Sequence, residues 1–286
     1  MPSSLTRAKR LLVGRPLATE RLEHERLNKK TALAVLSSDA ISSVAYATDQ
    51  ILFVLGGAIG VVAIGYVIPI TGVIVGLLLL VGLSYRQTIF AYPNGGGSYT
   101  VARENLGVMP GLIAAAALLT DYILTVAVSI SSGVAAMTSA YPSLVPHTIA
   151  ICVGAIVLLM VINLRGVRES GAVFSAPTYA FIVMMLLLIG IGAWRAWTGT
   201  ELPVGVVHVP KVDAVSARLH GTGTDLTGFA LFYLLLRGFA EGCSAMTGTE
   251  AISNGIQAFK APAQKNASKT LVWMVVILGV FVLGVA

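Results

Sequence analysis

The chain has 286 residues, of which 56% are hydrophobic and 11% are charged, and its mean hydropathy is +0.85. Soluble globular domains carry about 25% charged residues, so the composition excludes an ordinary soluble protein. A membrane-spanning helix needs about 20 mostly apolar residues, and the chain contains several such stretches. We therefore expect an all-α protein that crosses the membrane several times.

The first part of the chain is a polar head with eight Lys and Arg residues. It lacks the apolar segment of a cleavable signal peptide, and residues 1–30 are predicted to form a cytoplasmic tail. Residues 31–286 are predicted to form one transmembrane transporter domain. The two cysteines, Cys152 and Cys243, have neither a disulfide framework nor a metal-site spacing.

Seven apolar stretches follow the head and predict seven spans. The stretch over 85–107 is predicted to be a polar loop with helical character. The chain ends at FVLGVA inside an apolar run, so we expect it to be part of a longer protein. The expected spans cover about 32–57, 60–84, 109–138, 146–164, 171–194, 226–257 and the residues from about 270.

Charge in the loops predicts the orientation. With the head inside, fifteen Lys and Arg residues fall on the inner side and three on the outer side, while Arg237 lies within a span. Cytoplasmic loops are enriched in Lys and Arg. The chain is therefore predicted to be a multi-pass protein of the cell membrane with a cytoplasmic N-terminus.

The first span contains an unusually polar stretch, SSDAISSVAYATDQ at 37–50. A carboxylate at bilayer depth costs about 2.5–3.5 kcal/mol on insertion scales, so such residues usually have a function. Asp39 and Tyr46 are seven residues apart and share a face if the helix is continuous. Ser42 and Ser43 between them are predicted to break the helix. Asp49 lies nearer the outer end, where an interfacial role is as reasonable as a functional one.

The third span carries Asp121, Thr125 and Ser129 at intervals of four residues. This spacing places one carboxylate and two hydroxyls on a single helix face. Hydroxyls are also common where membrane helices pack together, so a packing role remains open for Thr125 and Ser129. Asp121 is the stronger candidate, because a carboxylate is costly to bury.

The sixth span is predicted to be unwound near its middle. Gly242 and Gly248 flank Ser244 and Thr247 within seven positions, and unwound segments of this kind expose backbone carbonyls to a substrate. Two acidic residues lie on either side. Glu241 can pair with Arg237 four residues earlier or take part in proton coupling, and Glu250 is either a proton-transfer site or a solvated helix end.

Interrupted spans at corresponding positions point to a transporter site between two inverted repeats. Spans one and six are five apart, so we predict a first repeat over about 32–194 and the start of a second over about 226–286. The chain is not expected to be an enzyme or to hold a cofactor. The LLTDY segment around Asp121 lacks the glycines of a membrane aspartyl protease, all four histidines lie in loops or ends, and NGGGSY lacks the Lys-Ser/Thr of a nucleotide loop.

Four segments resemble a known family. YPNGGGSYTVAREN at 92–105 resembles the segment after the second span in amino acid–polyamine–organocation (APC) permeases. SSDAISSVAYATDQ, DYILTVAVSISSGV and GCSAMTGTEAISNG are similar to KimA-type potassium uptake permeases, which are related to the KUP group of that superfamily. The resemblance implies a LeuT-like fold and proton-coupled potassium import. It also implies a homodimer with a cytoplasmic C-terminal domain, where cyclic-dinucleotide regulation is expected.

The resemblance also implies roles for individual residues. The transported ions would be potassium and protons. Proton coupling would involve Asp39 or Asp121, and Glu241, which is not a familiar part of the family pattern, is a further candidate for it. Potassium would bind at Asp39, Tyr46, Asp121, Thr125, Ser129 and Thr247, with Ser244 as a further candidate.

One departure from the superfamily pattern bears on the substrate. Amino acid permeases often carry a G-S/T-G triplet in span one, whereas this chain has Ser42-Ser43-Val44. With Asp39 and Asp121 nearby, a site for a cation is favoured. The alternatives are an amino acid or polyamine permease on the same fold and, from another class, a membrane sensor or scaffold that transports nothing.

Overall fold

The computed structural model describes residues 26–95, 97–164, 167–199 and 228–286. Within these ranges every regular element is an α-helix or a 3₁₀-helix, and one isolated bridge pairs Leu27 with Phe259. The predicted cytoplasmic tail lies outside the described residues as far as residue 25. The all-α fold class expected from the composition is confirmed.

Among the described residues, seven stretches are long and apolar enough to cross a membrane. They are helices because backbone polar groups in lipid must form their hydrogen bonds within the chain. The sixth stretch combines the elements on both sides of the interruption in span six. The stretches are Ser38–Ile59, Ile64–Ala91, Val108–Ala140, Pro142–Leu164, Val173–Thr198, Phe229–Asn254 and Ala263–Val285.

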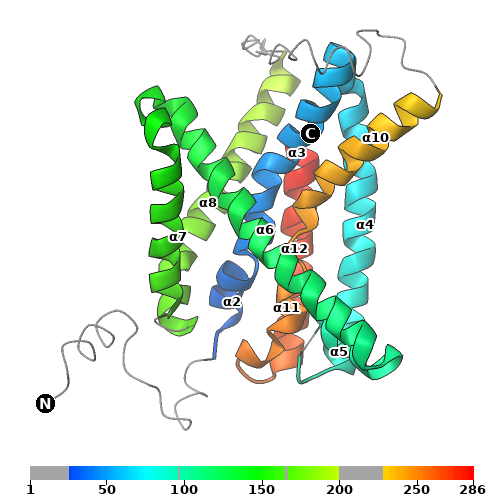
Figure 1. Ribbon diagram of the computed structural model, residues 1–286, viewed down its shortest axis with the longest axis vertical. Coiled ribbons are helices and arrows are strands. Elements are labelled where there is room, and N and C mark those ends of the chain that lie inside the picture. Colours follow the sequence, from blue (N-terminus) through cyan, green and yellow to red (C-terminus); the bar gives the residue numbers. More distant parts are fainter. Residues whose placement is uncertain (1–25, 96, 165–166, 200–227) are drawn as a thin grey trace, which may run out of the picture. The chain divides into compact units, whose positions relative to one another are not determined.

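Figure 1 labels most of the helices. Two short 3₁₀ segments, η2 (Gly60–Ala63) and η3 (Pro142–His147), join long helices. In the described residues, η4 (Cys243–Met246) follows α10, and η5 (Ile256–Ala258) follows the short helix α11. The α-helices are α2 (Lys29–Leu36), α3 (Ser38–Ile59), α4 (Ile64–Ala91), α5 (Gly97–Leu106), α6 (Val108–Ala140), α7 (Thr148–Leu164), α8 (Val167–Thr198), α10 (Phe229–Gly242), α11 (Ala251–Asn254) and α12 (Ala263–Val285).

The chain divides into two compact units, each built from three separated segments. Unit 1 comprises Met1–Asp39, Ser84–Tyr179 and Glu250–Val272, and unit 2 comprises Ala40–Leu83, Ala180–Thr249 and Trp273–Ala286. The two units are described separately below.

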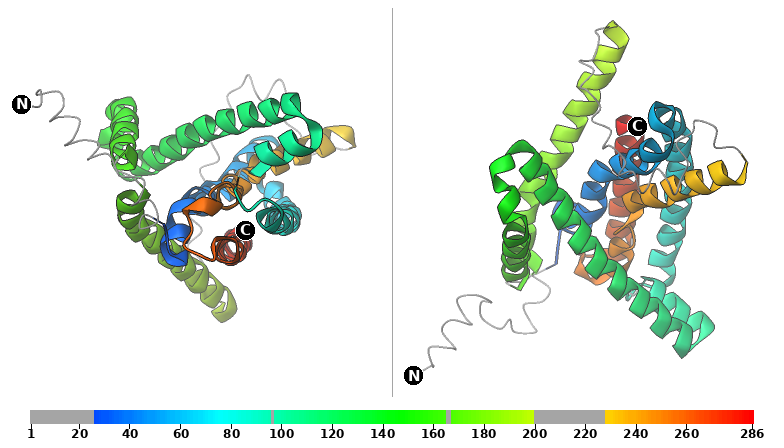
Figure 2. Two further views of the ribbon diagram at one scale, coloured as in Figure 1. Left: turned by 90° about the horizontal axis from the view of Figure 1, so that it is seen from below. Right: turned by 45° about the horizontal axis from the view of Figure 1, so that its top comes forward.

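In unit 1, α5 packs on the start of α6, and α6 and α7 form a hairpin through η3 (Figures 1 and 2). Two glycines allow the sharp turn between α5 and α6. Gly107 has a φ of 101°, which side chains rarely adopt, and a Cβ on Gly111 would come within 2.8 Å of Arg103 Cβ. The polar helix α5 is therefore fixed against the first turns of a membrane span.

In unit 2, α10 packs closely on α3 through two glycines four residues apart. A Cβ on Gly238 would lie 3.1 Å from Leu55, and one on Gly242 would lie 2.6 Å from Ile51. Small residues at this spacing let membrane helices approach closely. Ile51 and Leu55 are almost fully buried, so this contact holds the end of α10 against the middle of α3.

The predicted helix break at Ser42 and Ser43 is wrong. Both residues lie within the continuous helix α3, and the interruption falls at Ser37 between α2 and α3. The Ser37 N–H still donates to the Leu33 carbonyl at 3.0 Å, and the residue is fully buried. Serine residues do not force a break, because the hydroxyl can bond to groups along the same helix.

The polar loop expected over 85–107 is also largely helical. The helix α4 continues to Ala91, and α5 begins at Gly97. The connection that remains is short and contains Asn94 and Gly95, and both Gly95 and Gly97, the first residue of α5, have a positive φ. The turn therefore depends on the Gly-rich motif of the sequence, whereas the residues on either side have ordinary helical character.

Candidate functional site

The end of α10 leaves backbone groups free for other contacts. The helix stops at Gly242, η4 makes one tight turn, and Thr247 has a non-helical ψ of 144°. Gly248 follows with a φ of 75°, a conformation that favours glycine. The last carbonyls of a helix have no partner within it, so this interruption offers polar backbone atoms inside a membrane span.

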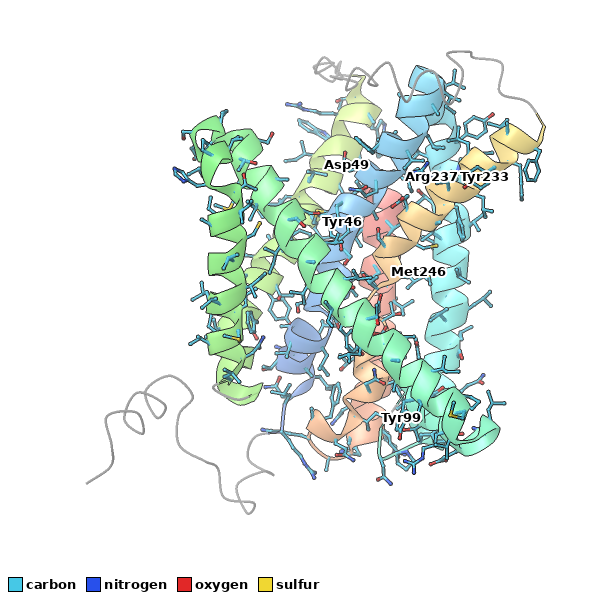
Figure 3. All side chains as sticks on the ribbon, in the orientation of Figure 1. Tyr46, Asp49, Tyr99, Tyr233, Arg237 and Met246 are labelled. Carbon is cyan, nitrogen blue, oxygen red and sulfur yellow. The ribbon has the colours of Figure 1, made fainter. Side chains whose placement is uncertain are left out.

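Four residues of unit 2 bring their oxygen atoms together at this interruption. We call Ser43, Tyr46, Ser244 and Thr247 the hydroxyl cluster. The Tyr46 hydroxyl donates to Ser43 Oγ at 2.8 Å, and Ser43 Oγ lies 3.1 Å from Thr247 Oγ1. Thr247 Oγ1 donates to the Ser244 carbonyl at 2.8 Å. Figure 3 labels Tyr46 on α3 and Met246, the last residue of η4, which precedes Thr247.

The hydrogen bonds of the hydroxyl cluster run in one direction. The hydrogen of Thr247 goes to the Ser244 carbonyl, so the Thr247 oxygen can accept from Ser43. Ser43 in turn accepts from Tyr46. Ser43 is fully buried, and the buried Oγ of Ser244 has no hydrogen-bond partner among the described residues. The cluster thus presents several neutral oxygen atoms, one of which is unsatisfied.

Three acidic residues of unit 1 form a second group, which we call the carboxylate cluster: Asp39, Asp121 and Glu250. They come from the start of α3, from α6 and from the residue before α11. Glu250 and Asp121 both repel the carboxyl group of Asp39 electrostatically. Asp121 also repels the carboxyl group of Glu250. Asp39 also lies in the first turn of α3, where the helix dipole favours a negative charge.

Glu250 is the most buried member of the carboxylate cluster. Only 7% of its surface is exposed, and Oε1 has no hydrogen-bond partner among the described residues. The carboxyl group interacts electrostatically with the side chain of Tyr122 on α6. An incompletely paired carboxylate in a membrane span is costly and is commonly functional.

From the sequence the role of Glu250 stayed open, and Tyr122 was not among the predicted site residues. A signal for Tyr122 was present, because it follows Asp121 directly in LLTDY. Its neighbour Asn254 could not have been identified, since the Asn254 side chain donates to the Tyr122 hydroxyl across 132 positions of sequence, at 2.9 Å. Sequence spacing within one helix does not reveal such contacts.

The remaining predicted residues lie on the same helices. On α6, Thr125 is buried, and the buried Oγ of Ser129 has no hydrogen-bond partner among the described residues. Both follow Asp121 at helical spacing in unit 1. Glu241 is half-buried near the end of α10, and Asp49 is exposed on α3. Figure 3 labels Asp49 on α3 and Arg237 on α10.

The two clusters differ in what they can do chemically. Within the described ranges, no three His, Cys, Asp or Glu side chains are close enough to hold a metal ion together. The three carboxylates therefore interact through space without forming a chelating group. Hydroxyl and carbonyl oxygens, which replace the hydration shell of alkali ions, are provided by the hydroxyl cluster.

Comparison with known proteins gives two results. The sequence model of the family described as amino acid permease matches residues 27–286. The potassium transporter KimA of Bacillus subtilis (strain 168) is 47% identical over 277 residues, which cover 97% of this chain and 43% of the relative. The chain thus spans less than half the length of that relative. It belongs to the amino acid permease family.

Proposed function

We propose that this member of the amino acid permease family imports potassium, driven by proton symport, and that the hydroxyl cluster binds the ion. The observation that carries the proposal is the line of oxygen atoms from Tyr46 through Ser43 to Thr247, next to the interrupted end of α10. The similarity to a protein named as a potassium transporter supports the same conclusion.

Neutral oxygen ligands suit an ion that must be released as readily as it is bound. Potassium sites use carbonyl and hydroxyl oxygens that replace water without adding a full negative charge. The cluster supplies the oxygens of Ser43, Tyr46 and Thr247 and the carbonyl of Ser244. On binding, their lone pairs would turn toward the ion, and the hydrogen bonds between them would be exchanged for ion contacts.

The carboxylate cluster suits proton exchange. Two or more interacting acidic groups take up and release protons as a set, and a proton on one of them reduces the repulsion among the others. We propose that Asp39, Asp121 or Glu250 carries the coupled proton, with Glu241 as a more distant candidate along the sequence. The wider ligand set predicted from the family, including Asp39, Asp121, Thr125 and Ser129, belongs to the same proposal.

An amino acid substrate is the second candidate, because the family description names it. Its carboxylate would need free N–H donors in span one. Residues 42–44 lie inside the continuous helix α3, where N–H groups are engaged four residues back. The N–H groups that have no partner within the helix are at the start of α3, where the negative charge of Asp39 opposes a second carboxylate. These features favour a cation.

For the arrangement in the membrane, we propose a cytoplasmic N-terminus in the cell membrane. The first five spans would form one repeat, and the residues from about 226 would begin an inverted copy of it. This arrangement is the basis of alternating access in transporters with interrupted helices. The homodimer and the cyclic-dinucleotide control implied by the family resemblance stay predictions.

Uptake of radioactive rubidium, a potassium analogue, tests the proposal. Host cells that lack their own potassium importers would express the protein. We expect saturable uptake that potassium inhibits and that a protonophore abolishes. Uptake of labelled amino acids without rubidium uptake would favour the second candidate and would reject potassium import.

A further inference from the structure

The short helix α11 packs against the turn between α4 and α5 in unit 1. Its last residue, Asn254, lies against Gly95 and Gly97. A Cβ on Gly97 would overlap Asn254 Oδ1, and a Cβ on Gly95 would come within 2.8 Å of the Asn254 carbonyl. Gln257 donates to the Asn94 carbonyl at 2.7 Å from the same side. The turn between α4 and α5 therefore receives Asn254, and any larger residue at its glycines would displace it.

Asn254 makes one more contact, which reaches the carboxylate cluster. Its Nδ2 donates to the Tyr122 hydroxyl at 2.9 Å. A tyrosine hydroxyl that accepts a hydrogen bond still has its own hydrogen to donate. The charged group that acts most strongly on the Tyr122 side chain is Glu250, which lies four residues before Asn254 on the same side of the interruption in span six. The bond from Asn254 therefore orients a tyrosine hydroxyl whose hydrogen is available to the Glu250 carboxyl group.

We propose that Asn254 and Tyr122 are positioning residues for Glu250: Asn254, fixed by Gly95 and Gly97, orients the Tyr122 hydroxyl, which holds the Glu250 carboxyl group for proton exchange. The inference rests on the proposed function and adds two residues that do not themselves touch the transported ion.

The surroundings of Glu250 explain why one hydrogen bond matters. The carboxyl group is almost fully buried, and Oε1 has no hydrogen-bond partner among the described residues. The other ionisable groups acting on it are Asp39 from α3, Asp121 from α6 and Tyr85 from α4. The carboxylates repel it, whereas its own backbone N–H and the Tyr122 hydroxyl are the neutral donors that act on it, and of these two Tyr122 is the one supplied by another helix.

Transport kinetics test the positioning role. We expect Tyr122→Phe to lower the maximal rate of rubidium uptake about tenfold, the size of one lost hydrogen bond to a charged group. The half-saturating rubidium concentration should change less than about twofold, since binding in the ground state is not altered. Asn254→Ala should lower the maximal rate in the same way.

A double variant shows whether Asn254 acts through Tyr122. Residues in one network are not additive, so Asn254→Ala should cause no further loss in the Tyr122→Phe background. The matched control is Asn105, whose Nδ2 donates to the Tyr92 hydroxyl at 2.7 Å in the same unit. Asn105→Ala and Tyr92→Phe should leave uptake unchanged. Fully additive losses, or variants that raise the half-saturating concentration, would overturn the positioning role.

A spectroscopic measurement decides the inference independently of transport. The purified protein would carry fluorotyrosine, and the fluorine signal that disappears in Tyr122→Phe would be assigned to Tyr122. We expect that signal to shift in both Asn254→Ala and Glu250→Gln but not in Asn105→Ala. If the Tyr122 fluorine signal did not shift in Glu250→Gln, the inference would be overturned. Absence of rubidium uptake by the unaltered protein would instead reject the proposed function, and the fluorine signal would still report on positioning.

Discussion

The hydroxyl cluster and the carboxylate cluster differ in the charge of their side chains and in how these side chains interact. In the hydroxyl cluster, neutral groups satisfy one another, from Tyr46 through Ser43 and Thr247 to the Ser244 carbonyl. In the carboxylate cluster, like charges act on one another, and Glu250 Oε1 has no hydrogen-bond partner in the described part of the chain. The hydroxyl cluster is thus stabilised by hydrogen bonds among its members, whereas the members of the carboxylate cluster repel one another.

This difference suggests that the two clusters bind different ions. A set of neutral oxygens that largely bond to one another binds an alkali ion modestly, because ion contacts replace hydrogen bonds of similar strength. A set of repelling carboxylates responds strongly to one proton, because each charge removed relieves the others. Symport requires both properties in one protein, so changes in the two clusters should produce different kinetic defects.

The largest effect is expected from removing charge in the carboxylate cluster. The combined variant Asp39→Asn and Asp121→Asn should reduce rubidium uptake by at least about a hundredfold, since interactions of charged groups are worth about 1.5–3 kcal/mol each. Uptake is measured per amount of protein in the membrane. Asp49→Asn is the control, because Asp49 lies on α3 but is exposed. Normal uptake by the combined variant would remove these carboxylates from the mechanism.

A smaller and different effect is expected in the hydroxyl cluster. Thr247→Val keeps the shape but removes the oxygen between Ser43 and the Ser244 carbonyl. The half-saturating rubidium concentration should rise about tenfold, as expected when one or two polar contacts are lost, while the maximal rate changes less.

The chain offers a close control for this variant. Thr249 is buried, and its Oγ1 donates to the Met246 carbonyl at 2.9 Å, as Thr247 does to Ser244. Thr249→Val should leave the half-saturating concentration unchanged. Equal effects of the two variants would mean that Thr247 serves the fold of the interruption and not the ion.

The smallest effect is expected where the chain only supports the carboxylate cluster. In Gly97→Ala, the added Cβ would overlap Asn254 Oδ1, and the positive φ adds strain of about 1–2 kcal/mol. Uptake should fall several-fold, by less than in Tyr122→Phe, and thermal stability in detergent should decrease.

Gly60→Ala separates the effect of backbone strain from the effect of the contact with Asn254. Gly60 has a φ of 61° but no atom within 4 Å of an added Cβ. It should lower thermal stability by a similar amount through strain alone and should leave uptake per folded protein unchanged. If both variants lowered uptake equally, the contact between Gly97 and Asn254 would have no specific role.

Much of the fold could be predicted from the sequence, because lipid imposes length and apolarity on each span. All seven expected spans are present. The break in span one was misplaced, since Ser42 and Ser43 looked like breakers but fit a helix, whereas Ser37 ends one. Composition does not distinguish a serine that caps a helix from one that lies within it.

The candidate site could be predicted only where its residues share a helix or a visible glycine motif. Tyr46 and Thr247 were selected on such grounds, and the structure places both in the hydroxyl cluster. The contacts that surround Glu250 join residues more than a hundred positions apart. They arise from tertiary packing, and no periodicity in the sequence encodes them.

Binding of radioactive rubidium to the purified protein tests the central claim most directly. The claim is that the neutral oxygens of the hydroxyl cluster hold the ion. We predict saturable binding that potassium displaces and amino acids do not, weakened about tenfold by Thr247→Val and unchanged by Thr249→Val. Rubidium binding that is the same in both variants, or that an amino acid displaces, would contradict the claim.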